Sequence, residues 1–297
     1  SEAATDSTER PGASIIFATG PEQKNTFTLL RGTDGFVSQH IGDVENANVI
    51  FTAHYDTCAR LPFPNFIAPK NLIATILYSI LICVPFFVFT TALCILLIEI
   101  TSKFLLSYWI SVIAMVIAFY FIMFGGRPNK NTANDNTSGV IVLVELLLSL
   151  PEEDMKKAAF VFFDNEENGL LGSGAFRKVH KQAMGGKLLI NFDCVSDGDN
   201  IMLVCTKKAL KKYGNALKKT FLSTDEKRIL IEKSMTTLYP SDQMGFSHGV
   251  GVAAMKKMPI IGYYLDRIHT KHDTVMDNRN IDLLRSASEN LLKSFDD

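Results

Sequence analysis

The chain has 297 residues, and its 30 basic and 31 acidic residues give a formal net charge of −1 at pH 7. This length suits one large α/β domain or two smaller ones, and the balanced charge offers no bulk attraction to nucleic acid. The five cysteines form neither a CxxC pair nor an even set, which argues against a disulfide framework. We therefore expect a reducing compartment and cysteines that serve as small core residues.

The first structured segment is expected between Ser14 and Ile41. Glycines interrupt this stretch at intervals, which is typical of strands joined by tight turns. We expect these strands to add an antiparallel edge to a sheet.

The most apolar part of the chain comes next. Residues 72–98 contain no charged residue, and a second uncharged stretch covers residues 104–124. Each exceeds the roughly 18 to 20 residues that a helix needs to cross a bilayer. Two buried helices of a soluble core are the alternative, but such helices normally keep polar residues on one face. We therefore predict a transmembrane helical hairpin that contacts the lipid bilayer through both stretches, with the first helix kinked at Pro85.

The position of this hairpin sets the domain organisation. We expect an inserted hairpin at residues 67–124 and one discontinuous domain built from residues 1–66 and 125–297. Both ends of the hairpin return to the same side, so the domain lies close to the membrane. Its flank carries the basic residues Lys70, Arg127 and Lys130, against Lys103 and Glu99 at the far end, and this bias favours a cytoplasmic domain.

Short apolar stretches and amphipathic stretches alternate in the rest of the chain. The stretches that predict strands are Asn48–Ala53, Ala158–Phe163, Lys187–Phe192 and Asn200–Cys205. The stretches that predict helices are Ser138–Leu150, Leu170–Lys181, Lys207–Phe221 and Ile281–Phe295. This alternation predicts an α/β fold with a mixed, mostly parallel sheet and helices on both faces.

Polar side chains follow several of the predicted strands. His54 and Asp193 each follow a strand directly, and the acidic pair Glu166 and Glu167 comes shortly after another. Ligands of open α/β sheets gather beyond the carboxyl ends of the strands, and Asp135 can reach the same edge from the loop before a helix. Singly, these residues could be solvated turns or turn formers. Together they suit zinc, with cobalt or manganese as substitutes, and a pair of metals is the usual arrangement for aminopeptidase-type hydrolysis.

Six motifs carry a family resemblance at this point. In chain order they are AHYDT, DNTSG, EENGLLGS, NFDCVSDG, SDQ and HTKHDT. This order resembles the M28 family of co-catalytic zinc peptidases, the aminopeptidase Y and glutamate carboxypeptidase II class. The resemblance extends from about Ser14 to Phe295 and leaves out only the hairpin. It implies a phosphorylase/hydrolase-like α/β fold, peptide substrates and two zinc ions.

The resemblance also implies a set of metal ligands. His54 and Asp193 would bind one zinc ion, and Glu167 and His269 would bind the other. Asp135 would be the carboxylate that bridges both ions.

Further roles follow from the same motifs. Glu166 would be the general base that takes a proton from a water between the metals and delivers it to the leaving amine. Asp56 would orient the imidazole of His54. The spacing selects His269 rather than His272 as the ligand, and Asp273 would support the loop.

The chain departs from the family pattern in two places. Gln243 stands where the family commonly has a histidine, in the SDH motif. Tyr239, just before Pro240, is a candidate donor of a hydrogen bond to the tetrahedral oxyanion. The second departure is the hairpin, which either covers the cleft or only anchors the domain.

A membrane-anchored metallopeptidase, in particular an aminopeptidase, is the favoured interpretation. The alternative is a non-hydrolytic or single-zinc member of the fold, either glutaminyl cyclase-like or a binding protein with lapsed catalysis. The residues for a second metal argue against a single-zinc enzyme. A transporter is weaker still, because the two helices offer no polar pathway through the membrane. The residues distinguish neither exopeptidase from endopeptidase activity nor one oligomeric state from another.

Overall fold

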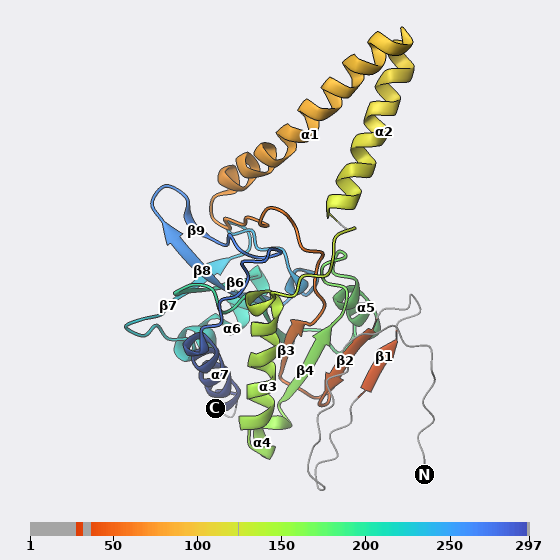
Figure 1. The fold of residues 1–297 in the computed structure, drawn as a ribbon. Coiled ribbons are helices and arrows are strands. Elements are labelled where there is room, and N and C mark those ends of the chain that lie inside the picture. The colour runs from red at the N-terminus through yellow and green to blue at the C-terminus, as the bar shows by residue number, and fades with distance from the viewer. Residues whose placement is uncertain (1–27, 32–36, 124, 296–297) are drawn as a thin grey trace.

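A mixed nine-stranded sheet lies at the centre of a computed structural model that describes residues 28–31, 37–123 and 125–295 (Figure 1). The strand order is β1-β2-β4-β3-β5-β8-β6-β7, and β9 pairs with β8. The strands are β1 (Thr28–Arg31), β2 (Val37–Ile41), β3 (Val49–His54), β4 (Ala158–Phe163), β5 (Leu188–Phe192), β6 (Asn200–Cys205), β7 (Arg228–Lys233), β8 (Gly249–Met258) and β9 (Gly262–Tyr264).

The central strands β4, β3, β5 and β8 are parallel to one another. Every residue of β3, β4 and β5 is buried, as expected for strands that are covered on both faces. The neighbouring strands β2 and β6 run antiparallel to this core, and β7 is parallel to β6. The predicted α/β fold with a mixed, mostly parallel sheet is confirmed.

Helices cover both faces of the sheet. These helices are α3 (Gly139–Ser149), the short α4 (Glu152–Met155), α5 (Leu171–Val179), α6 (Lys207–Thr220) and α7 (Asn278–Lys293). Side chains of α3, α6 and α7 pack on the face that carries Phe51 and Phe160, whereas Phe176 of α5 packs on the opposite face against Phe163. Neighbouring residues along each strand therefore bury their side chains in different cores.

The early strands confirm the expected antiparallel edge. The β1–β2 pair is antiparallel, and β2 joins the sheet through β4. The rest of the predicted segment, residues 14–27 and 32–36, lies outside the described residues.

The sequence patterns did not predict β7, β8 or β9. The strand β8 lies inside the sheet although its sequence, GVGVAAMKKM, begins with glycine-rich and small residues of low strand propensity. The small residues are needed because the Gln243 side chain packs against this strand. A Cβ at Gly251 would lie 2.6 Å from the amide of Gln243.

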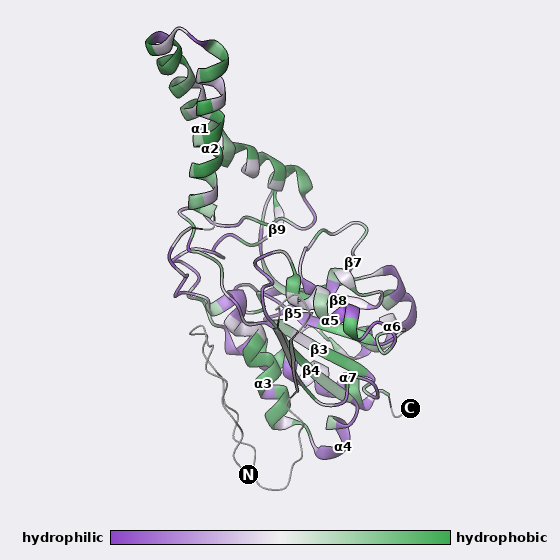
Figure 2. Ribbon diagram, turned by 90° about the vertical axis from the view of Figure 1, so that its right-hand side faces the viewer, coloured by the Kyte–Doolittle hydropathy of each residue, from purple (hydrophilic) through white to green (hydrophobic). Residues whose placement is uncertain are grey.

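The two remaining helices, α1 (Leu72–Thr101) and α2 (Phe104–Met123), form a hairpin that projects away from the sheet and its helices (Figure 1). Both are long and apolar enough to cross a membrane. No residue of α1 is buried within its described range, and the buried residues of α2 are Ser107 and Ser111. The alternative of two core helices is therefore wrong, because the apolar side chains of these helices are exposed. Figure 2 shows that hydrophobic residues predominate along both helices.

The two helices contact each other near the tip and again near the middle of α1. The Thr101 and Ser107 hydroxyls lie 3.0 Å apart, and the rings of Phe86 and Phe119 meet edge to face at 5.4 Å. Figure 2 shows that α1 bends, so that its beginning runs over the α/β region while its end lies beside α2. Pro85 lies inside α1 and lacks the N–H that would complete the helix there, which is the usual cause of such a bend.

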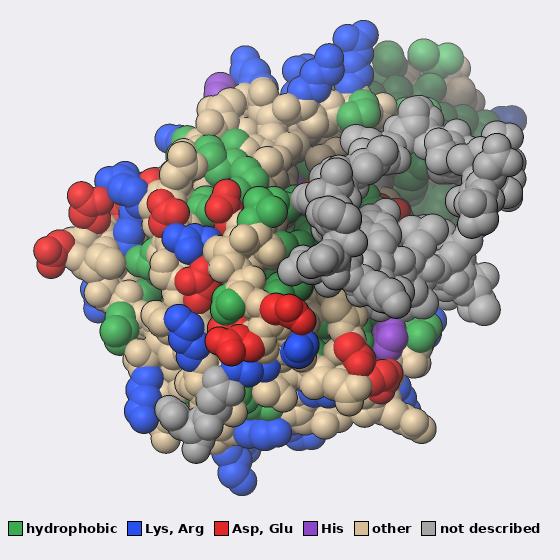
Figure 3. All heavy atoms as spheres, turned by 90° about the horizontal axis from the view of Figure 1, so that it is seen from below, with side chains coloured by type: hydrophobic (Ala, Val, Ile, Leu, Met, Phe, Trp, Pro, Cys, Tyr) green, Lys and Arg blue, Asp and Glu red, His purple; other side chains and the backbone are tan. Residues whose placement is uncertain are grey.

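The surface opposite the hairpin has a different character. Figure 3 shows basic and acidic side chains interspersed on that face, as on a protein surface in contact with water. The exposed apolar side chains of α1 and α2 stand in clear contrast to it.

Candidate metal centre

The predicted ligands come together at the carboxyl ends of the parallel strands. His54 is the last residue of β3, and Asp193 follows β5 directly. Glu166 and Glu167 lie in the turn that follows β4. Because β3, β4 and β5 are parallel neighbours, their ends present these side chains at one edge of the sheet.

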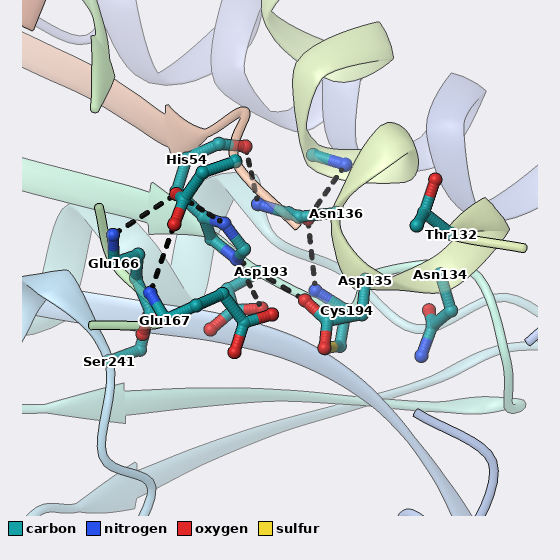
Figure 4. A network of polar contacts seen from close by, with 12 residues as sticks. His54, Thr132, Asn134, Asp135, Asn136, Glu166, Glu167, Asp193, Cys194 and Ser241 are labelled. Atoms are coloured by element: carbon teal, nitrogen blue, oxygen red, sulfur yellow. Dashed lines mark hydrogen bonds and ion pairs between the residues drawn. The ribbon is translucent and has the colours of Figure 1, made fainter. Parts of the chain in front are cut away.

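One group of ligand atoms surrounds His54. Its Nε2 lies 3.3 Å from Oδ1 of Asp135 and 3.6 Å from Oδ1 of Asp193 (Figure 4). All three side chains are buried. Burial alone lowers the pKa of His54, but its hydrogen bonds to Asp135 and Asp193 outweigh this and raise the pKa well above its usual value.

A second group surrounds His269. Its Nε2 lies 3.0 Å from Oδ2 of Asp135 and 3.1 Å from Oε2 of Glu167. The backbone of His269 has a φ of 65°, a left-handed conformation that is uncommon for a residue other than glycine. Strain of this kind often marks functional positions.

Asp135 joins the two groups. One of its carboxyl oxygens faces His54 and the other faces His269. Its backbone N–H and that of Asn134 donate to the two carboxyl oxygens of Asp273, at 2.9 and 2.7 Å. Asp273 thus supports the Asp135 loop, in the place that the sequence indicated.

The spacing of the ligand atoms fits zinc. Two ligands that each bind zinc at about 2.0–2.2 Å in tetrahedral geometry lie roughly 3.3–3.6 Å apart. The distances from the histidine nitrogen to the carboxylates are 3.3 and 3.6 Å in the His54 group, within this range, and 3.0 and 3.1 Å in the His269 group, slightly below it. In addition, Oε1 of Glu167 is buried and has no hydrogen-bond partner among the described residues. The nitrogen and oxygen donors therefore fit one metal ion in each group.

Asn136 fixes the relative positions of the strand ends. Its side-chain amide donates to the carbonyls of His54 and Phe192, at 3.3 and 3.0 Å, and its oxygen accepts from the N–H of Gly139 and Cys194, each at 3.2 Å. This one side chain thus holds β3, β5 and the start of α3 together (Figure 4).

The structure explains why the last residue of the DNTSG motif, Gly139, is a glycine. A Cβ there would lie 2.3 Å from the Phe192 carbonyl oxygen. Only glycine allows α3 to approach β5 this closely without moving the Asp135 loop.

Asp56 orders the acidic turn as well as the histidine. Its two carboxyl oxygens accept the N–H groups of Glu166 and Glu167 at 3.0 and 3.2 Å. One of the same oxygens lies 3.4 Å from Nδ1 of His54. The sequence indicated the contact with the histidine but not the clamp on the Glu166–Glu167 backbone.

Glu166 has the electrostatic setting of a proton carrier. Burial raises the pKa of its carboxyl well above the usual value, the positive charge on His54 opposes this, and the nearby carboxylates of Asp193, Asp242 and Glu167 add to the rise. A carboxyl with a raised pKa can hold a proton closer to neutral pH, as a general acid or base requires.

Tyr239 and Gln243 occupy structural positions. The Tyr239 hydroxyl is buried and donates to the backbone carbonyl of Asp193 at 3.0 Å. Since its single hydrogen is used there, this arrangement does not support Tyr239 as an oxyanion donor.

Gln243 donates to the Tyr239 carbonyl at 2.8 Å and accepts from Asn191 at 3.3 Å. His272 is exposed and belongs to neither ligand group.

The cysteines correct one expectation. Cys194 and Cys205 are buried, as core residues should be, whereas Cys83 and Cys94 lie on α1 and are only partly buried. Cys58 is also partly buried, and its Sγ lies within 4.8 Å of ligand atoms of Glu167 and His269. The sequence offered no motif that would place this thiol beside the site.

A cleft opens beside the second ligand group. Its volume is about 310 Å³, and Glu167, His269 and Cys58 form part of its wall. Leu61 and Met123, the last residue of α2, form another part. The ligands are therefore accessible from the side on which the hairpin leaves the α/β region.

Comparison with known families agrees with this site. The profile described as Peptidase family M28 matches residues 120–294, more than half of the chain, and the chain therefore belongs to this family. A second profile, described as HypF Kae1-like domain, matches only residues 12–62, whose described strands belong to the same sheet. No match was found among curated protein sequences.

Several solved structures are similar to this chain. The LapA aminopeptidase of Legionella pneumophila is 11% identical, with a TM-score of 0.53 over 92% of this chain and 59% of LapA. The glutaminyl cyclase of Porphyromonas gingivalis is 14% identical, with a TM-score of 0.49 over 92% of this chain and 83% of the cyclase. The zinc aminopeptidase BSAP of Bacillus subtilis is 14% identical, with a TM-score of 0.48 over 88% of this chain and 49% of BSAP. The chain thus spans less than two thirds of LapA, and this likeness shows a shared fold.

Proposed function

We propose that this protein is a membrane-anchored dinuclear zinc metallopeptidase that hydrolyses peptide bonds, in particular as an aminopeptidase. The observation that carries the proposal is the position of Asp135, whose two oxygens face two separate histidine-containing ligand groups. A carboxylate in this position can bridge two metal ions, as two-metal hydrolysis requires.

In this proposal the ligands divide into two sets. His54 and Asp193 hold one zinc ion, Glu167 and His269 hold the other, and Asp135 binds both. When bound, the zinc ions supply Lewis acidity, which polarises the scissile carbonyl and makes a water molecule more acidic.

Glu166 moves the proton. Its carboxylate accepts a proton from the attacking water and later delivers it to the leaving amine. Asp56 keeps Glu166 in place through the backbone of the acidic turn, and the same carboxylate restrains the ring of His54. Burial of the ligands keeps bulk water away from these charges and strengthens their interactions.

The second ligand group favours hydrolysis over the alternative of a single-zinc enzyme. A glutaminyl cyclase-like protein or a binding protein with lapsed catalysis would need only one ion or none. Here the His269 and Glu167 pair is placed as closely around Asp135 as the His54 group is. Membership of a peptidase family supports the same choice.

The hairpin supplies the membrane anchor. We assign residues 67–124 to the inserted hairpin and residues 1–66 and 125–297 to one discontinuous metallopeptidase domain. The exposed apolar side chains of α1 and α2 support contact with lipid. Lys70, Arg127 and Lys130 flank the hairpin on the domain side, which favours a cytoplasmic domain.

The test is peptide hydrolysis with and without a chelator. The purified full chain, in detergent or lipid, is incubated with a mixed peptide library, and free amino acids and shortened peptides are identified by mass spectrometry. We expect stepwise release of N-terminal residues, lost with chelator and restored by zinc. Cleavage that persists in chelator, or no cleavage at all, would contradict the proposal.

A further inference from the structure

A second cavity adjoins the metal cleft and lies between the α/β region and the start of the hairpin. Its volume is about 400 Å³, which is in the range of sites that bind small ligands. The metal ligand His269 lines one end of it, while residues of α1 and α2 line the other. Leu61, Met123 and His269 line both this cavity and the cleft, so the two spaces adjoin each other at these side chains.

The wall of this cavity is mostly apolar. Among the described residues, no lysine, arginine, aspartate or glutamate lines it. Ile82 and Cys83 of α1 and Phe119 of α2 line it, and Phe63 and Phe66 come from the loop before α1. The polar side chains on this wall are few, among them Asn65, Thr75 and His269, so a charged or strongly hydrated ligand would find few partners, whereas apolar side chains would be buried there.

The helices place the outer end of the cavity at the level of the membrane. A helix of 30 residues, such as α1, is about 45 Å long, and one of 20 residues, such as α2, is about 30 Å long. The apolar core of a bilayer is about 30 Å thick, so α2 spans it fully and α1 has excess length. All α1 residues that line the cavity lie in its first part, between Leu72 and Cys83.

Contacts on the domain side tie this part of α1 to the metal site. The Tyr78 hydroxyl donates to the Pro64 carbonyl at 2.9 Å, and its ring lies 5.1 Å from that of Phe66. The same loop pairs with the segment that carries His269, because the N–H of Leu61 donates to the His269 carbonyl at 2.8 Å. These contacts fix the wall of the cavity between α1 and the metal ligand His269.

We propose that this cavity binds an apolar segment of the peptide substrate, which enters from the bilayer between α1 and α2 and reaches the metals at its other end. This inference rests on the peptidase function proposed above and names its substrate class: peptides that carry an apolar stretch next to the scissile bond. The mostly apolar wall, together with the side chains that the cavity shares with the metal cleft, favours this occupant. The hairpin then selects substrates as well as anchoring the enzyme.

The test uses tryptophan substitutions on α1 that fill the cavity. Ser79 lines the cavity, and its hydroxyl donates only to the carbonyl of Thr75 in its own helix, so a Ser79→Trp change adds bulk at little structural cost. Ile80 is the matched control, because it lies at the same depth, is 53% exposed and does not line the cavity. Cys83→Trp, one turn further along α1, repeats the test independently.

Binding is measured separately from turnover. Two fluorescent peptides share the same first residues, and one continues with leucine and alanine while the other continues with serine and glycine. Their dissociation constants are measured by anisotropy with the full chain in phosphatidylcholine nanodiscs, in a Glu166→Gln background. We expect Ser79→Trp and Cys83→Trp to raise the dissociation constant of the apolar peptide by about tenfold or more, because its apolar side chains are no longer buried. The dissociation constant of the polar peptide should change by less than about twofold. Ile80→Trp should change neither.

The outcomes separate the two proposals. Unchanged affinity for the apolar peptide in both cavity variants would overturn the inference and would point to a lipid chain as the occupant. Equal weakening of both peptides would also overturn it. Failure of the unmodified chain to cleave either peptide in a chelator-sensitive manner would instead overturn the proposed function.

Discussion

The α/β region and the hairpin bury opposite kinds of side chain. In the region around β3 to β5, phenylalanines, leucines and isoleucines are fully buried, and the polar surface opposite the hairpin faces water. In the hairpin the apolar side chains are exposed, and the buried residues of α2 are the serines Ser107 and Ser111. One physical rule explains both: a region exposes the kind of side chain that its surroundings solvate well. These are polar side chains in water and, for the proposed membrane anchor, apolar side chains in lipid.

This difference shows which part of the chain can bury charged metal ligands. The α/β region can bury charged ligands because strand ends and loops supply partners for them, as Asp273 does for the Asp135 loop. The helices of the hairpin offer few such ligands, because Glu99, near the end of α1, is their one charged residue. The first turns of α1 are the place where the two regions meet, and there the hairpin lines a cavity that leads to His269.

The largest expected effect separates catalysis from metal binding within the α/β region. Glu166→Gln should keep both zinc ions and lower kcat by about 10²- to 10⁴-fold, because the amide cannot accept the proton. Zinc content and turnover are measured on the same preparation. Glu153→Gln, on the exposed surface of α4, is the matched control and should behave like the unmodified chain. Full activity of Glu166→Gln would remove the general-base assignment.

Replacing the hairpin tests whether the two regions are independent. When residues 67–124 are exchanged for a flexible glycine–serine linker, the domain should remain in solution without detergent and should still bind zinc. The reason is that all five proposed ligands, His54, Asp135, Glu167, Asp193 and His269, lie outside the exchanged segment. Sedimentation without detergent and zinc content provide the measurement. A protein that still requires detergent, or that loses zinc, would show that the hairpin belongs to the folded core.

The smallest expected effect concerns a buried carboxyl of the α/β region. Burial raises the pKa of Asp242 from 3.8 to about 7. Between these two values the folded state keeps a proton that the unfolded state has lost. The stabilisation is therefore fully present below pH 3.8 and is lost as the pH rises to about 7, by an amount on the order of 4 kcal/mol.

Asp242→Asn should remove this pH dependence, because the amide stays neutral. The free energy of unfolding by urea, measured on metal-free protein between pH 4 and pH 8, should fall less steeply with pH in the variant. Asp282→Asn is the control, since this aspartate is exposed on α7. Identical slopes for the unmodified chain and Asp242→Asn would contradict the assignment of Asp242.

Part of the fold and of the candidate site could be predicted from the sequence. The strands β3, β4 and β5 are continuous apolar stretches, so their ends, and with them His54, Asp193 and the acidic pair, could be placed at one edge of the sheet. The two long apolar helices were recognisable for the same reason, since long apolar stretches have few alternative structures.

The rest depends on contacts between distant residues. The glycine-rich sequence of β8 does not indicate a strand, and its small residues are explained only by the Gln243 side chain that packs against it in the structure. The clamp of Asn136 on two strands, the hydrogen bond of Tyr239 to the Asp193 carbonyl and the place of Cys58 beside His269 all join segments that lie far apart in the chain. No local pattern specifies such pairings, because propensity and periodicity describe only neighbours along the sequence.

The central claim is that Asp135 bridges two zinc ions, and anomalous diffraction at the zinc absorption edge tests it most directly. Crystals of the zinc-loaded protein should show two anomalous peaks, one among His54, Asp135 and Asp193 and the other among Asp135, Glu167 and His269. A single peak, or none at these positions, would contradict the account.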